Sequence, residues 1–184
     1  MLSPIRAVFA ALAVALALAG GGARADDAGA LALAVKATYL YKFQPFITWP
    51  EQAPLAAGQT FNICIVGNDP FGAVIDRAVA GQAADQHPLA IVRLAAVPGD
   101  AGCRILYIAA GNPKLAGQAL AAMAGKPVLT VTDAAEDDGA KGMINFVIAA
   151  GRVRFEIDDA AARAGGLTVS SKLLSLAVSV KSAR

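Results

Sequence analysis

Two short apolar runs, each followed by a signal for the start of a helix, constrain the fold of this chain more than any other feature. Residues 61–66 precede Gly67-Asn68-Asp69-Pro70, and residues 105–108 precede Asn112-Pro113. An asparagine or aspartate followed by proline is typical of the first turn of a helix. Strands that alternate with helices in this way indicate a sheet with parallel pairing.

Further apolar runs add strands to this sheet. Residues 89–94 and 128–131 have the composition of buried strands. Residues 143–148 and 152–157 are separated by Ala149-Ala150-Gly151, which is the spacing of a β-hairpin with a short glycine turn. We therefore predict that the sheet ends in a C-terminal hairpin.

The predicted helices cover both faces of the sheet. Apolar residues from Leu31 to Phe43 recur every four positions and predict a helix. The two proline signals predict helices over residues 71–80 and 113–124, and Asp158 or Asp159 caps a short helix. Residues 167–180 predict one amphipathic helix that buries Leu167, Leu174 and Val178. The resulting fold class is α/β, a three-layer sandwich with helices on both faces of a mixed sheet that has a parallel portion.

The amino-terminal segment predicts export. Arg6 precedes an apolar run over residues 7–19, and Ala23-Arg24-Ala25 has the pattern of a signal-peptidase site. The run is shorter than the roughly 20 residues that span a bilayer. We expect cleavage after Ala25, a periplasmic product without direct membrane insertion, and one domain over residues 26–184.

The charge balance of the expected product excludes some partners. Loss of Arg6 and Arg24 leaves 14 of the 16 basic residues, against 14 acidic ones. A net charge near zero argues against nucleic-acid binding and against a polybasic membrane-surface patch.

The two cysteines, Cys64 and Cys103, each lie in or beside a predicted strand. An oxidising compartment favours a disulfide between them, and two buried thiols are the alternative.

No motif of a catalytic, metal or cofactor site is present in the sequence. The single histidine, His87, precedes a proline in a polar stretch that indicates a loop, and no set of metal ligands accompanies it. Ser170 and Ser171 lack the glycine pattern of a nucleophile elbow, and we expect them near a helix start. We therefore expect a protein that is not an enzyme and binds neither metal nor cofactor.

The densest group of mixed charges is a candidate binding surface. A polar partner or ligand is one interpretation, and structural ion pairing across strands or from strand to helix is the other. The group consists of Arg152, Arg154, Glu156, Asp158 and Lys172.

Several blocks in a fixed order carry a family resemblance. They are residues 35–43 (VKATYLYKF) with Trp49-Pro50, residues 61–72 (FNICIVGNDPFG), residues 103–108 (CRILYI), residues 144–157 and residues 164–177 (AGGLTVSSKLLSLA). With these blocks the chain resembles the YfiR-like family of exported bacterial proteins. It departs from the family pattern at Asp158, where asparagine is common, and at Asn145, where glycine is common, and it has no second cysteine pair.

The resemblance implies a non-enzymatic periplasmic regulator. In the family's known member, the protein represses an inner-membrane diguanylate cyclase by binding its periplasmic segment, which limits cyclic di-GMP and biofilm formation. Cys64 and Cys103 match one disulfide of that member. The alternative function is that of a small-molecule binding or sensing protein with a pocket beside the sheet. The sequence does not decide whether the protein forms a homodimer.

Overall fold

The computed structural model describes residues 22–97, 99, 102–133 and 139–182. Of the expected signal peptide, residues 1–21 lie outside this part and the last four begin a helix. In chain order the elements are α2 (Gly22–Lys42), η1 (Gln44–Phe46), β1 (Ile47–Thr48), β2 (Phe61–Val66), α3 (Ala73–Val79), β3 (Ala83–Ala84), β4 (His87–Leu94), β5 (Cys103–Ile108), α4 (Pro113–Met123), β6 (Leu129–Thr132), β7 (Ile144–Ala149), β8 (Arg152–Asp158), α5 (Asp159–Ala164), β9 (Thr168–Val169), α6 (Ser171–Leu174) and β10 (Ser179–Lys181).

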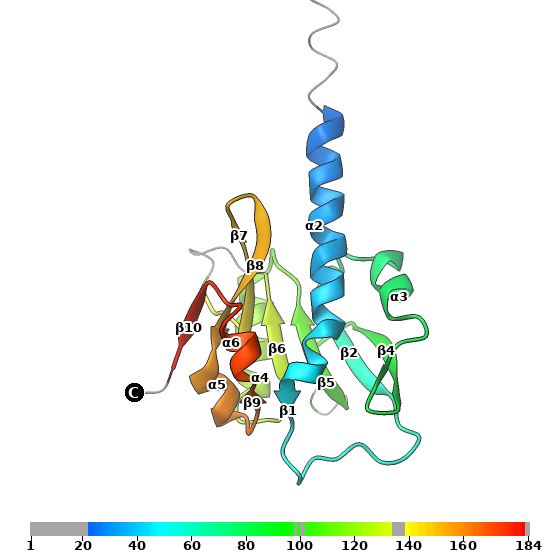
Figure 1. Ribbon diagram of the computed structural model, residues 1–184, viewed down its shortest axis with the longest axis vertical. Helices are drawn as coiled ribbons and strands as arrows, with labels where there is room; N and C mark the ends of the chain where they lie inside the picture. The colour runs from blue at the N-terminus through cyan, green and yellow to red at the C-terminus, as the bar shows by residue number, and fades with distance from the viewer. Residues whose placement is uncertain (1–21, 98, 100–101, 134–138, 183–184) are drawn as a thin grey trace, which may run out of the picture.

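The main sheet has eight strands in the order β10-β8-β7-β6-β5-β2-β4-β3 (Figure 1). The five strands from β4 to β7 in this order run parallel, while β8 is antiparallel to β7, and β3 is antiparallel to β4. The outer strand β10 pairs with β8 in parallel. The mixed sheet with a parallel portion and the hairpin over β7 and β8 are therefore confirmed.

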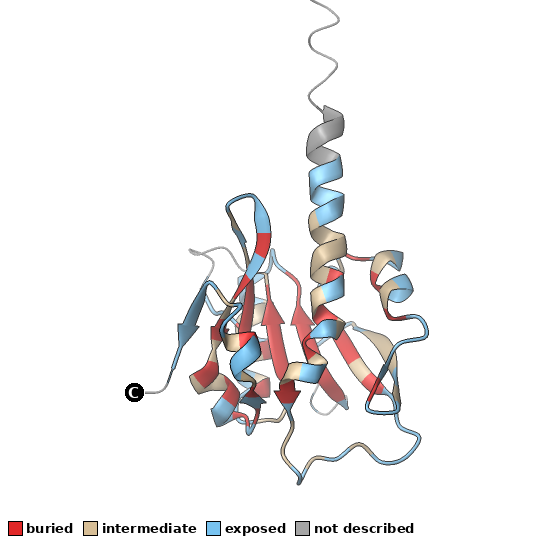
Figure 2. Cartoon of the chain, viewed as in Figure 1, coloured by how far each residue is buried: buried red, intermediate tan, exposed pale blue. Residues whose placement is uncertain are grey.

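Helices cover both faces of this sheet and make the predicted three layers. On one face, α4 encloses a small core in which Ala119 and Met123 pack on Cys64, Val66 and Leu106. On the other face, α2, α3, α5 and α6 enclose the larger core. The central strands are buried on both sides, whereas β10 and residues 27–31 of α2 are exposed (Figure 2).

The first helix is longer than the sequence periodicity predicted. It begins at Gly22 instead of Leu31, and its first half extends beyond the sheet (Figure 1). Ala37, Leu40 and Phe43 are buried on the sheet, while Leu31 is exposed. The ion pair of Lys36 with Asp133, 2.5 Å long, attaches the middle of α2 to the end of β6.

The prediction of one amphipathic helix over residues 167–180 is wrong. Thr168 and Val169 form β9, which pairs with β1, and α6 then covers only four residues before the chain continues to β10. Of the three residues expected in the core, Leu167 is buried, Leu174 is half-buried and Val178 is exposed. The bonds to β1 and β8 lie far away in sequence, so local periodicity did not reveal them.

Two helix-start signals had different outcomes. The Asn112 side chain accepts a hydrogen bond from the Leu115 amide and caps α4, as predicted. The turn at Asp69 does not begin α3, since its carboxylate accepts from the Phe71 amide and pairs with Arg93. This turn delays the helix to Ala73. His87 also differs from its expected loop position, because it begins β4.

The glycine pair after α5 has a steric cause. A Cβ atom on Gly165 would lie 2.7 Å from the Lys126 carbonyl oxygen and 2.9 Å from the Met143 methyl carbon. Gly166 has a φ of 75°, in the left-handed region that favours glycine. The pair therefore lets the chain turn closely past the start of β6 toward β9.

Candidate functional site

Cys64 and Cys103 form a disulfide between the neighbouring strands β2 and β5. Their Cα atoms are 5.8 Å apart, and both side chains lie in the small core under α4. This confirms the pairing. The disulfide is buried in this core and does not reach the surface of β8, where the charged candidate residues lie. It therefore stabilises the sheet and takes no part in the surface of β8.

The two acidic residues of the candidate group have basic partners outside the group. Glu156 accepts a hydrogen bond from Lys141 at 2.9 Å, and this bond lowers the pKa of the Glu156 carboxyl. Asp158 caps α5 through the Ala161 amide and pairs with Lys181 at 2.8 Å. Burial raises the pKa of Asp158, but these hydrogen bonds outweigh burial and leave it below the ordinary value. Both negative charges are thus neutralised locally.

The three basic residues of the group have no such compensation within the described part of the chain. Arg152 and Arg154 are exposed on β8, and Lys172 is exposed on α6. Among the described residues, the only hydrogen bond made by these three side chains runs from Arg154 Nη2 to the Leu176 carbonyl and is 3.0 Å long. None of them forms an ion pair with a described carboxylate. The structure therefore brings Arg152, Arg154, Glu156 and Asp158 onto one strand and leaves Lys172 apart.

A groove of about 400 Å³ lies between α2, β8 and the segment after α6, and we call it the hairpin groove. Its floor is aromatic, because the rings of Tyr39 in α2 and of Phe43 directly after α2 lie 5.6 and 5.3 Å from the ring of Phe155. Lys42, Arg152 and Arg154 bring positive charge to its border. The groove therefore combines an apolar floor with a cationic edge.

Exposed aliphatic side chains extend this apolar surface. Leu176 lines the groove and is 54% exposed. Ile148 is 60% exposed near the hairpin turn and lies on the same face of β7 as the buried Phe146, because alternate strand residues share a face. The last pair between β6 and β7 is Thr132 with Asn145, and the first pair between β10 and β8 is Ser179 with Glu156. Beyond these pairs, no strand among the described residues pairs with the hairpin. The hairpin is thus available to a partner.

A family model described as YfiR/HmsC-like matches residues 33–178, which includes every element from the middle of α2 to the segment before β10. The chain belongs to the YfiR/HmsC-like family. No curated protein matches it. Membership confirms the resemblance drawn from the sequence blocks and supports a regulatory function over a catalytic one.

The two departures from the family pattern are accommodated within this family fold. Asn145 is buried and accepts a hydrogen bond from the Thr132 hydroxyl at 2.8 Å, and its side chain also bonds to Glu156. Asp158 keeps the capping function that an asparagine side chain would have. Neither change disrupts the hairpin.

Within the described residues, no helix has the length and apolar character needed to cross a membrane. The same part of the chain contains no cluster of three or more histidine, cysteine or acidic side chains that would hold a metal ion.

Sequence reasoning found the cationic edge of the groove but missed its floor. Tyr39 and Phe43 belong to the apolar residues that predicted the first helix, and both pack in the larger core. Their additional position in the groove depends on α6 and Leu176, which lie more than a hundred residues later. The available signal was the run of apolar residues between Leu173 and Val178, which exceeds what a four-residue helix can bury.

Proposed function

We propose that this protein is a periplasmic regulator that represses an inner-membrane diguanylate cyclase by binding the cyclase's periplasmic segment at the hairpin groove. Family membership supports the regulatory function, and a buried disulfide agrees with an oxidising compartment. The segment bound in the groove would be amphipathic, with apolar side chains against Leu176 and the aromatic floor. Its acidic groups would face Arg152 and Arg154.

The observation that carries the position of this site is the uneven charge pairing on β8. The acids Glu156 and Asp158 have partners, while Arg152 and Arg154 form no described ion pair. Exposed arginine beside apolar surface is typical of protein interfaces, because its guanidinium binds carboxylates and its stem packs on apolar groups.

A genetic experiment tests the function itself. Deletion of the gene should raise cellular cyclic di-GMP, and restoration of the exported chain should lower it. A chain without residues 1–25 should fail to restore repression, because it stays on the cytoplasmic side. Unchanged cyclic di-GMP after deletion would refute the repressor function.

A binding experiment tests the proposed surface. Leu176→Glu places a charge on the groove and should weaken binding to the purified periplasmic segment by about tenfold or more, as for a buried interface residue. Ala121→Glu is the matched control, because Ala121 is exposed on α4 at the opposite face of the sheet. Equal effects of the two substitutions would contradict this placement of the site.

A further inference from the structure

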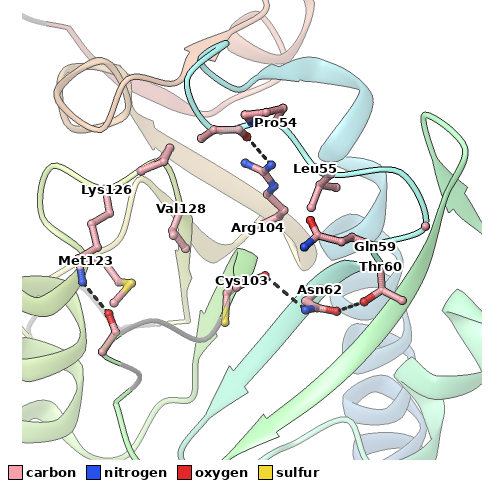
Figure 3. Close-up of a pocket in the computed structure, with 15 residues that line it drawn as sticks. Pro54, Leu55, Gln59, Thr60, Asn62, Cys103, Arg104, Met123, Lys126 and Val128 are labelled. Atoms are coloured by element: carbon pink, nitrogen blue, oxygen red, sulfur yellow. Dashed lines mark hydrogen bonds between the residues drawn. The ribbon is translucent and has the colours of Figure 1, made fainter.

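A cavity lies at the amino ends of β2, β5 and β6, and we call it the amino-end pocket (Figure 3). Its volume of about 660 Å³ is in the range of small-molecule sites. The loop before β2 forms one wall, and the end of α4 with the start of β6 forms the other. The hairpin turn lies at the carboxyl end of β7, which runs parallel to β6, so the two surfaces are separate.

A nearly buried arginine projects between these walls. Arg104 is only 8% exposed, and its guanidinium donates a hydrogen bond to the Ala53 carbonyl (Figure 3). No described carboxylate forms an ion pair with it, and burial lowers the pKa of its guanidinium. A guanidinium has five donors, so one carbonyl leaves most of them available.

The polar groups around Arg104 also favour an anion. Gln59 accepts a hydrogen bond from the Ala56 amide through Oε1, which leaves its amide nitrogen without a partner among the described residues. Lys126, whose Nζ donates a hydrogen bond to the Gly99 carbonyl, adds a second cation. The described residues that line the pocket include no aspartate or glutamate. Burial of charge is unfavourable unless an opposite charge compensates it, so an anionic ligand would stabilise this arrangement.

The remaining lining is apolar and suits an organic body. Leu55 stands on the loop wall, while Met123 and Val128 stand on the opposite wall (Figure 3). Cys103 lies at the base, so the disulfide holds the strand that carries Arg104. The pocket thus offers one charge-recognition point and an apolar space beside it.

We propose that the amino-end pocket binds a small organic acid, with its carboxylate on Arg104 and its apolar body against Leu55, Met123 and Val128. The planar fork of an arginine matches a carboxylate with two parallel hydrogen bonds. This inference does not rest on the repressor function, since it concerns a different part of the surface.

Methionine methyl signals give a direct test on the full chain. Met123 lines the pocket, whereas Met143 is buried in the larger core on the other face of the sheet. With ¹³C-methyl methionine, titration with hexanoate, 4-methylpentanoate and phenylacetate should shift the Met123 signal and leave Met143 unchanged. Fragment-sized acids should bind with dissociation constants on the order of 1 mM. Their neutral amides should bind at least about tenfold more weakly, because they lack the charge that Arg104 recognises.

Two substitutions separate binding from folding. Arg104→Gln should abolish the difference between acid and amide, and Thr60→Trp should obstruct the pocket while Arg104 stays intact. Thr38→Trp on the exposed side of α2 is the control for the added ring and should bind the acids normally. The proposal is overturned if no acid shifts Met123, if acids and amides bind equally, or if Thr60→Trp leaves binding unchanged.

Discussion

Replacement of both cysteines by alanine should lower the free energy of unfolding by about 4 kcal/mol. The disulfide joins residues 39 positions apart. In the chain-entropy model, opening a loop of this length returns about 13 cal/mol/K to the unfolded chain, which is about 4 kcal/mol at 25 °C. This is a large share of the net stability of an ordinary domain. The effect acts through the unfolded state, so the native fold should persist at neutral pH.

Equilibrium urea unfolding of the oxidised chain and of the Cys64→Ala/Cys103→Ala variant measures this difference. The slope with urea should increase in the variant, because its unfolded state is less compact. Reductant should destabilise the wild type and leave the variant unchanged, which controls for effects of the reagent. A loss below about 1 kcal/mol would refute the reasoning, since the loop constraint would then not dominate.

Three further predictions follow from packing and charge. Leu173→Ala should cost about 2–5 kcal/mol because Leu173 is buried, and Leu174→Ala should cost clearly less because Leu174 is half-buried; equal losses in urea unfolding would contradict the four-residue α6. Gly165→Ala should destabilise through its contact with the Lys126 carbonyl, whereas Gly117→Ala, in open space within α4, should stabilise by up to about 1 kcal/mol; thermal unfolding that shows the same sign for both would contradict this. The pKa values of Glu156 and Asp158 are lowered in the folded state, so the unfolded state binds more protons. The free energy that these two carboxylates add to folding is therefore complete above about pH 5 and is lost as the pH falls through their folded-state pKa values. Lys141→Met removes the partner of Glu156 and should make the loss of unfolding free energy in acid shallower.

Features set by local chemistry were predictable from the sequence. The apolar run of β2, the hairpin turn and the Asn112 cap depend on neighbouring residues, and each lies where it was predicted. The segment after Gly166 was not predictable in this way. Its leucines have helical spacing, but Thr168 pairs with β1 and Val180 pairs with β8. A continuous helix over this segment would exclude both strand pairings.

The candidate sites divide along the same line. Alternation along β8 revealed its exposed charges, because one strand carries them all. The hairpin groove needs α2 beside α6, and the amino-end pocket needs the loop before β2 beside β6. The sequence did hold one signal for the pocket. Arg104 is a charged residue in an otherwise apolar strand, and arginine is rarely buried unless a partner compensates its charge.

The arginines of the hairpin groove and of the amino-end pocket differ in their exposure to solvent, and this difference decides which kind of partner each site suits. Arg152 and Arg154 are exposed to solvent, where salt screens their attraction and where they mainly guide a charged partner into contact. Arg104 is almost enclosed, so salt screens it far less, and one bound carboxylate would replace the water that the guanidinium has lost. A rise in ionic strength should therefore lower the affinity of a macromolecule for the hairpin groove much more than the affinity of an organic acid for the amino-end pocket. The first surface suits rapid and reversible protein contact, and the second suits selective recognition of a small anion.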